Sequence, residues 1–193
     1  MKEKYLTALL NRINHLKAFK TGDFLLSSGK KSDFYFDGRL LTLDPEALNA
    51  ITELFLNIIR EKKVNFIGGP ATASIPIISS LVLSSFDNNK KNPNELISGF
   101  FVRNNLKTHG TGNIIEGHLL EKSRVIIIDD TLTTGNSILQ TIKHVEKKQC
   151  DIVEILTILD RNEKGKMNLN NLGYKVTSLL IYNNQNKIIE KNL

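Results

Sequence analysis

The chain has 193 residues, 40% of them hydrophobic and 24% charged, which is enough for one domain with a core of ordinary size over residues 1–193. Its formal net charge of +6 comes from lysines spread along the chain, many beside asparagines, and no dense basic run marks a nucleic-acid-binding arm. Signal-like and bilayer-spanning apolar stretches are absent and the single cysteine, Cys150, excludes an internal disulfide, so we expect a cytoplasmic protein that binds neither nucleic acid nor a membrane.

The first part of the chain predicts a helix followed by two short extended segments. Residues 5–19 place leucine, isoleucine and phenylalanine side chains at helical spacing, and Gly22 is expected to end this segment. Residues 24–26 and 34–36 are apolar and aromatic runs typical of strands, with a polar turn at 27–32 between them.

From residue 45 onward, strands and helices alternate. Asp44 and Pro45 are typical of a helix start, and an apolar stripe carries this helix to about residue 61. The further elements that we expect are a strand at 64–67, a helix at 74–84, a polar loop at 87–95, a strand at 99–102, a long loop at 103–117, a strand at 125–128, a helix from Ser137, and strands at 153–159 and 175–181, the last of the chain. This alternation predicts an α/β fold with a mostly parallel central sheet, helices on both faces, and ligands bound at the carboxyl ends of the strands.

The most informative segment is 125–137, Val-Ile-Ile-Ile-Asp-Asp-Thr-Leu-Thr-Thr-Gly-Asn-Ser. A strand buried on both faces delivers two adjacent carboxylates, and a loop rich in hydroxyl groups then opens directly into a helix. The N-terminus of a helix binds phosphate well, because its first N–H groups are free and carry partial positive charge. The carboxylates suit ribose hydroxyls or a Mg²⁺ ion bound to other phosphate oxygens. The implied ligand is a sugar phosphate with free hydroxyls.

Three other interpretations of segment 125–137, ordinary helix capping, a dinucleotide site and a P-loop, explain its residues less well than a sugar-phosphate site. Ordinary capping, with Ser137 as the N-cap, would not explain two acids at the end of a buried strand. The chain has no G-x-G-x-x-G after a strand and no G-x-x-x-x-G-K-[ST], which argues against a dinucleotide site and a P-loop.

Segment 125–137 resembles the phosphoribosyl-pyrophosphate (PRPP) signature of type I phosphoribosyltransferases. Three other segments are similar to those of the orotate enzymes of this family: 24–39, which lies over the base as a small N-terminal hood; 103–113, a catalytic loop; and 159–165, a strand end with an arginine for the orotate carboxylate. Many or some members carry lysines where this chain has Asn104 and Asn105, and near Ser27 and Ala73.

The resemblance implies Mg²⁺-dependent transfer of a phosphoribosyl group from PRPP to orotate, a step of pyrimidine biosynthesis, by a homodimer with shared active sites. The catalytic residues that it implies are Lys107, His109, Asp129 and Asp130. The PRPP-binding residues are Arg103, Lys107, His109, Asp129, Asp130, Thr131, Thr133, Thr134, Gly135, Asn136 and Ser137. The orotate-binding residues are Phe34, Tyr35, Thr133 and Arg161, and Mg²⁺ is held through PRPP with Asp129 and Asp130 as candidate ligands.

Two other functions remain open at this stage. A purine or other base phosphoribosyltransferase would keep the PRPP segment without needing Arg161 or the 24–39 segment. A regulator of the same fold that senses PRPP would bind nucleic acid with a steep salt dependence, although no helix-turn-helix or basic extension is evident.

Overall fold

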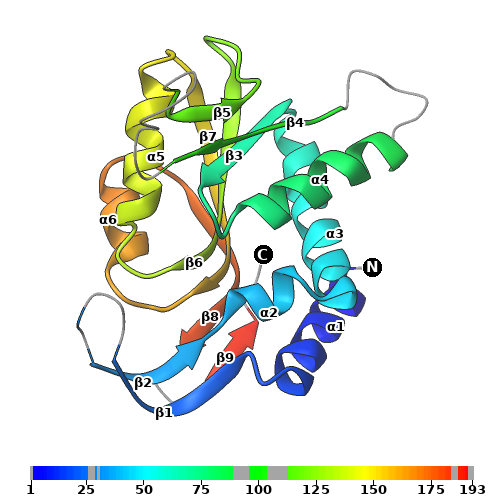
Figure 1. Cartoon of the computed structure of the whole chain (residues 1–193), viewed down its shortest axis with the longest axis vertical. Helices are drawn as coiled ribbons and strands as arrows, with labels where there is room; N and C mark the ends of the chain where they lie inside the picture. Colours follow the sequence, from blue (N-terminus) through cyan, green and yellow to red (C-terminus); the bar gives the residue numbers. More distant parts are fainter. Residues whose placement is uncertain are drawn as a thin grey trace.

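The computed structural model describes residues 2–25, 29, 31–88, 96–103, 113–183 and 187–190 (Figure 1). The helices in this part of the chain are α1 (Lys2–His15), α2 (Gly38–Thr42), α3 (Pro45–Lys62), α4 (Ile75–Asn88), α5 (Asn136–Glu146) and α6 (Gly165–Asn171). The strands are β1 (Phe19–Leu25), β2 (Lys31–Phe36), β3 (Phe66–Pro70), β4 (Ser98–Val102), β5 (Ile115–Gly117), β6 (Arg124–Leu132), β7 (Asp151–Asp160), β8 (Val176–Asn183) and β9 (Lys187–Glu190).

A seven-stranded sheet with the order β5-β4-β3-β6-β7-β8-β9 forms the centre of the fold. Strands β4, β3, β6, β7 and β8 are parallel to one another, whereas β5 and β9 pair antiparallel at the two edges. The chain runs from β3 through α4 to β4 in one direction and from β6 through α5 to β7 in the other, so the order reverses between β3 and β6. Ligands of open α/β sheets bind beside the carboxyl ends of the strands at such a reversal. The predicted α/β fold is confirmed.

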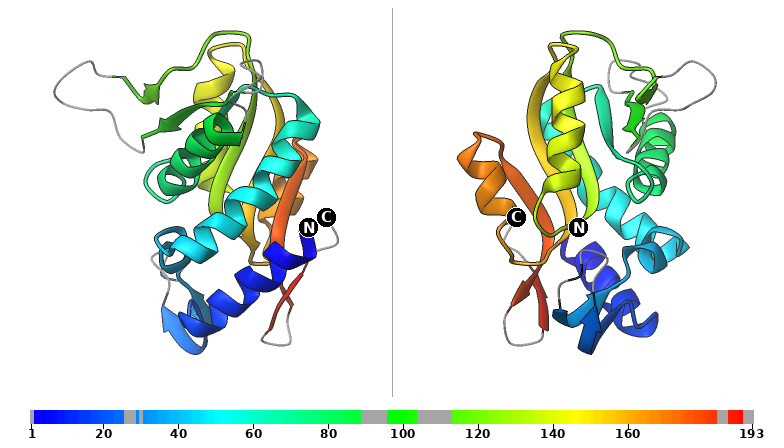
Figure 2. Two further views of the ribbon diagram at one scale, coloured as in Figure 1. Left: turned by 90° about the vertical axis from the view of Figure 1, so that its right-hand side faces the viewer. Right: turned by 60° about the vertical axis from the view of Figure 1, so that its left-hand side comes forward.

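Both faces of the sheet are buried, as the apolar run in β6 predicts. Ile126 and Ile128 join a core with α1, α3 and α4, whereas Val125 and Ile127 join a second core with α5 and α6. Figure 2 shows these two groups of helices on opposite sides of the sheet. Since neighbouring side chains of a strand point to opposite faces, β6 must be apolar at consecutive positions to fill both cores.

The first helix is shorter than its sequence pattern predicts. It ends at His15, and the residues that we expected in its last turn lead into β1. Lys17 adopts a left-handed conformation with φ 51°, and the N–H of Ala18 donates to the carbonyl of Ile13. This is the usual way in which a glycine ends a helix. Because a lysine takes that place here, the sequence pattern carried no stop signal.

Several short elements of the structure were not predicted from the sequence. The region expected as a loop at 103–117 contains β5, and β9 follows the strand that we expected to be last. The short helices α2 and α6 were also not predicted, and Gly22 lies inside β1, where pairing with β2 is irregular. These elements are short, and short elements are stabilised by their packing partners more than by their own sequence.

The N-terminal hairpin of β1 and β2 is a separate two-stranded antiparallel sheet. It contacts the ends of the central strands through residues 32–38, as described below. No helix within the described residues is both long and apolar enough to cross a bilayer.

Candidate active site

Asp129 and Asp130 lie in the last part of β6, which continues to Leu132. The Asp129 side chain is buried, at 4% exposure. Its Oδ1 accepts a hydrogen bond from the backbone N–H of Asp130 at 3.0 Å, and its Oδ2 accepts one from the hydroxyl of Ser137 at 3.1 Å. The acid pair is therefore tied directly to the first turn of α5.

Burial makes both carboxylates unfavourable in their charged form. It raises the pKa of Asp129 well above its ordinary value, and the charge of Asp130 raises that pKa further. Burial also raises the pKa of Asp130, although the backbone N–H of Thr131 opposes this shift. Asp129 is buried and Asp130 beside it is half-buried. Holding two adjacent carboxylates away from water costs folding free energy, so their presence indicates a binding function.

The start of α5 is open to an anion. Its N-cap is Gly135, with φ 83°, and no side chain caps the first N–H groups. Ser137 lies in the first turn and bonds to Asp129, so the alternative interpretation of Ser137 as the N-cap is wrong. The left-handed φ explains the glycine, since other residues rarely adopt it. The uncapped N–H groups and the helix dipole can bind a phosphate here.

The N-terminal segment approaches the acid pair closely at α2. A Cβ atom built on Gly38 would lie 2.5 Å from Oδ2 of Asp130, which is closer than real contacts allow. Glycine is therefore required for α2 to pack against this carboxylate. Gly38 was not among the predicted site residues, although it lies in the segment that resembles the family's hood.

Arg161 lies on the neighbouring loop, after β7. Its backbone N–H donates to the carbonyl of Leu132 at 2.9 Å, and the backbone N–H of Gly165 donates to the carbonyl of Thr133 at 3.0 Å. These two hydrogen bonds join the β7–α6 loop to the β6–α5 loop. The Arg161 side chain is 6% exposed; its Nη2 donates to the Ser32 hydroxyl at 2.9 Å and its Nε to Glu163 at 3.2 Å. This buried cation therefore joins the hairpin to the carboxyl edge of the sheet.

The two predicted aromatic residues of β2 face opposite ways. Phe34 is buried and packs against Arg161, whose Cζ atom is 3.9 Å from the ring centroid. Tyr35 is half-buried on the other side of the hairpin, where its ring lies 5.7 Å from that of Phe24. The alternation of a strand separates them, so they cannot contact one ligand in the same way.

Arg103 lies just after β4, and its guanidinium pairs with Glu116 of β5 at 3.7 Å. Its backbone N–H donates to the carbonyl of Ile114, which joins the end of β4 to the start of β5. The other two predicted cations, Lys107 and His109, lie outside the described residues.

A family model described as a phosphoribosyl transferase domain matches residues 41–188. The chain is 33% identical over 175 residues to the orotate phosphoribosyltransferase of Pyrococcus horikoshii, with 90% of this chain and 89% of the relative covered. It is 34% identical over 176 residues to the orotate phosphoribosyltransferase of Methanosphaera stadtmanae, with 91% and 93% covered. The chain belongs to the orotate phosphoribosyltransferase family.

A solved member of this family has the same fold. The Mycobacterium tuberculosis orotate phosphoribosyltransferase, in complex with Fe(III) dicitrate, superposes with a TM-score of 0.75 at 27% identity, covering 92% of this chain and 96% of the other. The family resemblance drawn from segments 24–39, 125–137 and 159–165 is confirmed at the level of the family and the fold.

Of the predicted site residues, the structure brings together the acid pair, Thr131, Thr133, Thr134, Gly135, Asn136, Ser137 and, on the adjoining loop, Arg161. Among described residues, no group of three or more His, Cys, Asp or Glu side chains is placed to hold a metal ion.

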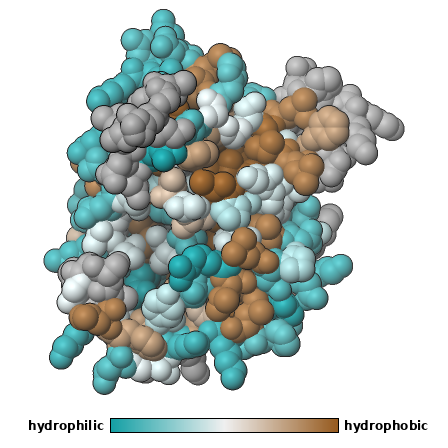
Figure 3. All heavy atoms as spheres, viewed as in Figure 1, coloured by the Kyte–Doolittle hydropathy of each residue, from teal (hydrophilic) through white to brown (hydrophobic). Residues whose placement is uncertain are grey.

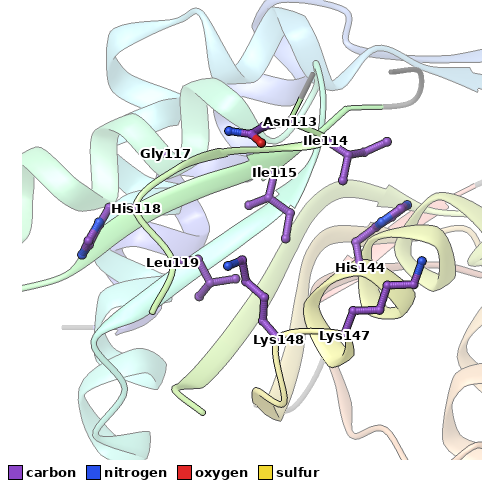
Figure 4. Close-up of a pocket in the computed structure, with 9 residues that line it drawn as sticks. All are labelled: Asn113, Ile114, Ile115, Gly117, His118, Leu119, His144, Lys147 and Lys148. Atoms are coloured by element: carbon purple, nitrogen blue, oxygen red, sulfur yellow. The ribbon is translucent and has the colours of Figure 1, made fainter. Parts of the chain in front are cut away.

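A basic pocket of about 360 Å³ lies elsewhere, between β5 and the last turn of α5 (Figure 4). His144, Lys147 and Lys148 line one side of it, and Ile115 and Leu119 line the other. It lies at the end of α5 opposite the acid pair. Cations are stabilised at the C-terminal end of a helix by the helix dipole, so this cluster needs no ligand to explain it.

Proposed function

We propose that the protein transfers the phosphoribosyl group of PRPP to orotate, giving orotidine 5′-monophosphate and pyrophosphate, and that it does so in the cytoplasm. One observation carries this proposal: the uncapped start of α5 lies beside an acid pair, buried Asp129 and half-buried Asp130, with a buried arginine on the adjoining loop. These three features match the phosphate, the ribose hydroxyls and the base carboxylate of the two substrates.

The first two features account for PRPP binding. The N–H groups at the start of α5 and the hydroxyls of Thr131, Thr133 and Thr134 can donate to the 5′-phosphate. Asp129 and Asp130 can accept hydrogen bonds from the two ribose hydroxyls in their ionised form. Because burial raises the pKa of both carboxyls, we expect PRPP affinity to fall in mildly acidic solution.

Arg161 accounts for orotate binding. The guanidinium group carries five N–H donors in a planar fork, and the contacts to Ser32 and Glu163 use two of them. A carboxylate is the natural partner for such a fork. Phe34 packs on the guanidinium, which supports Arg161 in this role, and Thr133 lies on the loop bonded to that of Arg161.

The chemistry requires stabilisation of the leaving pyrophosphate more than a protein nucleophile. Arg103 is placed at the end of β4, and Lys107 and His109 follow it in the sequence, so all three can neutralise negative charge on the leaving group. Mg²⁺ bound to PRPP would add Lewis-acid stabilisation of the same charge. Asp129 and Asp130 would meanwhile hold the ribose so that its reacting carbon faces the base.

We also propose a homodimer that forms through the exposed apolar face of α4. Figure 3 shows hydrophobic side chains gathered in this region. Leu83 and Phe86 are 63% and 57% exposed, and they line a cavity of about 620 Å³ with Ile78, Val82 and Phe101. Exposed apolar patches of this kind mark interaction sites, and the face borders β4 and β5, from which the predicted catalytic loop extends.

The dimer is tested by light scattering coupled to gel filtration. Leu83→Glu should give monomers, whereas Leu172→Glu, at a 60% exposed leucine after α6, should leave the dimer intact. If active sites are shared, mixing Asp129→Asn and Lys107→Ala subunits, each far less active than the wild type alone, should restore about a quarter of wild-type activity, because random pairing leaves one working site in half of the dimers. A wild-type monomer with full activity would refute this part of the proposal.

The reaction itself is tested by mixing the purified chain with orotate, PRPP and Mg²⁺ and following the loss of orotate absorbance. Chelation of Mg²⁺ should stop the reaction. Turnover of hypoxanthine or adenine, with none of orotate, would favour the purine alternative. Tight, salt-sensitive binding of nucleic acid without any turnover would favour a PRPP-sensing regulator.

A further inference from the structure

Phe34 lies between two partners. The ring of Tyr182 stacks on it with centroids 3.9 Å apart and an interplanar angle of 27°, and the Cζ atom of Arg161 also lies 3.9 Å from its centroid. Two groups cannot share one face of a six-membered ring at that distance, so they cover opposite faces. The ring is consequently 3% exposed and offers no face to a substrate.

Both ends of this stack are anchored to the same strand. The Tyr182 hydroxyl donates to Oδ2 of Asp33 at 2.9 Å, and Nη2 of Arg161 donates to the hydroxyl of Ser32 at 2.9 Å. Phe19 of β1 packs beside the stack, 5.5 Å from the Phe34 ring and 6.0 Å from the Tyr182 ring. Tyr182 belongs to β8, so the stack fixes the hairpin against the central sheet.

We propose that Tyr182 is a positioning residue for the base site, which acts through Phe34 to set the plane in which Arg161 presents its guanidinium. A bidentate bond to a carboxylate requires the two planar groups to lie in one plane. An arginine side chain has many rotamers, and a ring held at its flat face restricts that plane. Tyr182 therefore contributes to specificity for a base with a carboxylate without touching the base. This inference rests on the proposed function of Arg161.

The test compares two substitutions at Tyr182 with a matched control. Tyr182→Leu removes the stack, Tyr182→Phe keeps it but loses the bond to Asp33, and Tyr174→Leu removes a tyrosine that bonds to a carboxylate, Glu146, on the other side of the sheet. We expect Tyr182→Leu to raise the KM for orotate about two- to tenfold, the contribution of a stacked pair, and Tyr182→Phe to restore most of it. The KM for PRPP should stay within about twofold in all three.

Discrimination between bases gives a readout that a merely structural role would not change. Uracil lacks the carboxylate that Arg161 would bind, so the ratio of kcat/KM for orotate to that for uracil should fall in Tyr182→Leu by the same two- to tenfold factor. Equal losses for both bases, equal rises in both KM values, or the same pattern in Tyr174→Leu would overturn the proposal.

A measurement without turnover separates this inference from the proposed function. The Nε–H signal of Arg161 in ¹⁵N NMR spectra can be assigned by its absence in Arg161→Lys. In the wild type, this Nε–H proton should exchange slowly with water. We expect fast exchange in Tyr182→Leu and slow exchange in Tyr174→Leu, because only the first frees the guanidinium. Slow exchange in both would overturn the role of Tyr182 even if orotate is turned over. Absence of orotate turnover in the wild type would refute the proposed function alone.

Discussion

Replacing Asp129 by asparagine should lower activity and raise stability together. The substitution keeps the size of the side chain but removes a buried charge. Its amide oxygen can still accept from the N–H of Asp130, and the Ser137 hydroxyl can turn to accept from its amide nitrogen. The contacts of the folded protein are therefore kept, whereas the ionised acceptor for a ribose hydroxyl is lost.

The gain in stability follows from the cost of burying the carboxylate. Substitutions that relieve such a cost typically add about 0.5–2 kcal/mol to the free energy of unfolding. For a chain of 193 residues this corresponds to a rise in Tm of about 1–8 °C. The loss of a hydrogen bond to a charged group is worth about 1.5–3 kcal/mol, so kcat/KM for PRPP should fall about 10- to 150-fold for each ribose hydroxyl affected.

The stability difference between Asp129→Asn and the wild type should also depend on pH. The folded-state pKa of Asp129 is raised above its ordinary value of 3.8, so the folded protein holds this proton more tightly than the unfolded chain. Below pH 3.8 the carboxyl of Asp129 is protonated in both states and does not destabilise the wild type. As the pH rises through the raised folded-state pKa, the buried carboxyl must ionise and the wild type loses stability. Asp129→Asn has no such loss, so its advantage should be small near pH 4 and largest at neutral pH.

The assay is thermal unfolding from pH 4 to pH 8, together with the rate of orotate loss at varied PRPP. Asp151→Asn, at a largely exposed residue at the start of β7, serves as the control and should change neither measurement. PRPP with Mg²⁺ should raise the Tm of the wild type more than that of Asp129→Asn. An Asp129→Asn variant that keeps the wild-type kcat/KM for PRPP, or that is less stable than the wild type at neutral pH, would contradict this prediction.

Three further substitutions test other parts of the structure. Arg161→Lys keeps the charge but loses the planar fork, so the KM for orotate should rise about 10- to 100-fold while that for PRPP changes little; equal rises would contradict the assigned role. Burial raises the pKa of Glu154, but the Thr177 hydroxyl and two lysines lower it overall, so Glu154→Gln should cost about 1–3 kcal/mol at neutral pH. Urea unfolding should show that this cost disappears as the pH falls through the lowered pKa, and the variant should match the wild type in activity at neutral pH. Gly69→Ala would place a Cβ 1.9 Å from the carbonyl oxygen of Ile128 and should destabilise by about 3 kcal/mol or more, and a wild-type Tm would contradict the packing of β3 on β6.

The parts of the site that are local in the chain could be predicted from the amino-acid sequence alone. In segment 125–137, a strand apolar at consecutive positions, two acids, hydroxyl residues and a glycine specify a buried strand, a loop and a helix start within 13 residues. The periodicity of that segment and its turn chemistry act over short distances, so they can be read without knowing the rest of the fold. The same holds for the capped start of α3 at Asp44, whose side chain accepts from the N–H of Ala47.

The surroundings of Arg161, by contrast, depend on contacts between distant parts of the chain. Arg161 contacts Ser32 across 129 residues of sequence, and Tyr182 contacts Asp33 across 149. No local pattern encodes such a pair, because it exists only when the hairpin has packed on the edge of the sheet. The sequence predicted Phe34 as an orotate-binding residue on β2. Its place between Tyr182 and Arg161 depends on which face of β2 is turned toward the core, and packing against β8 sets that face.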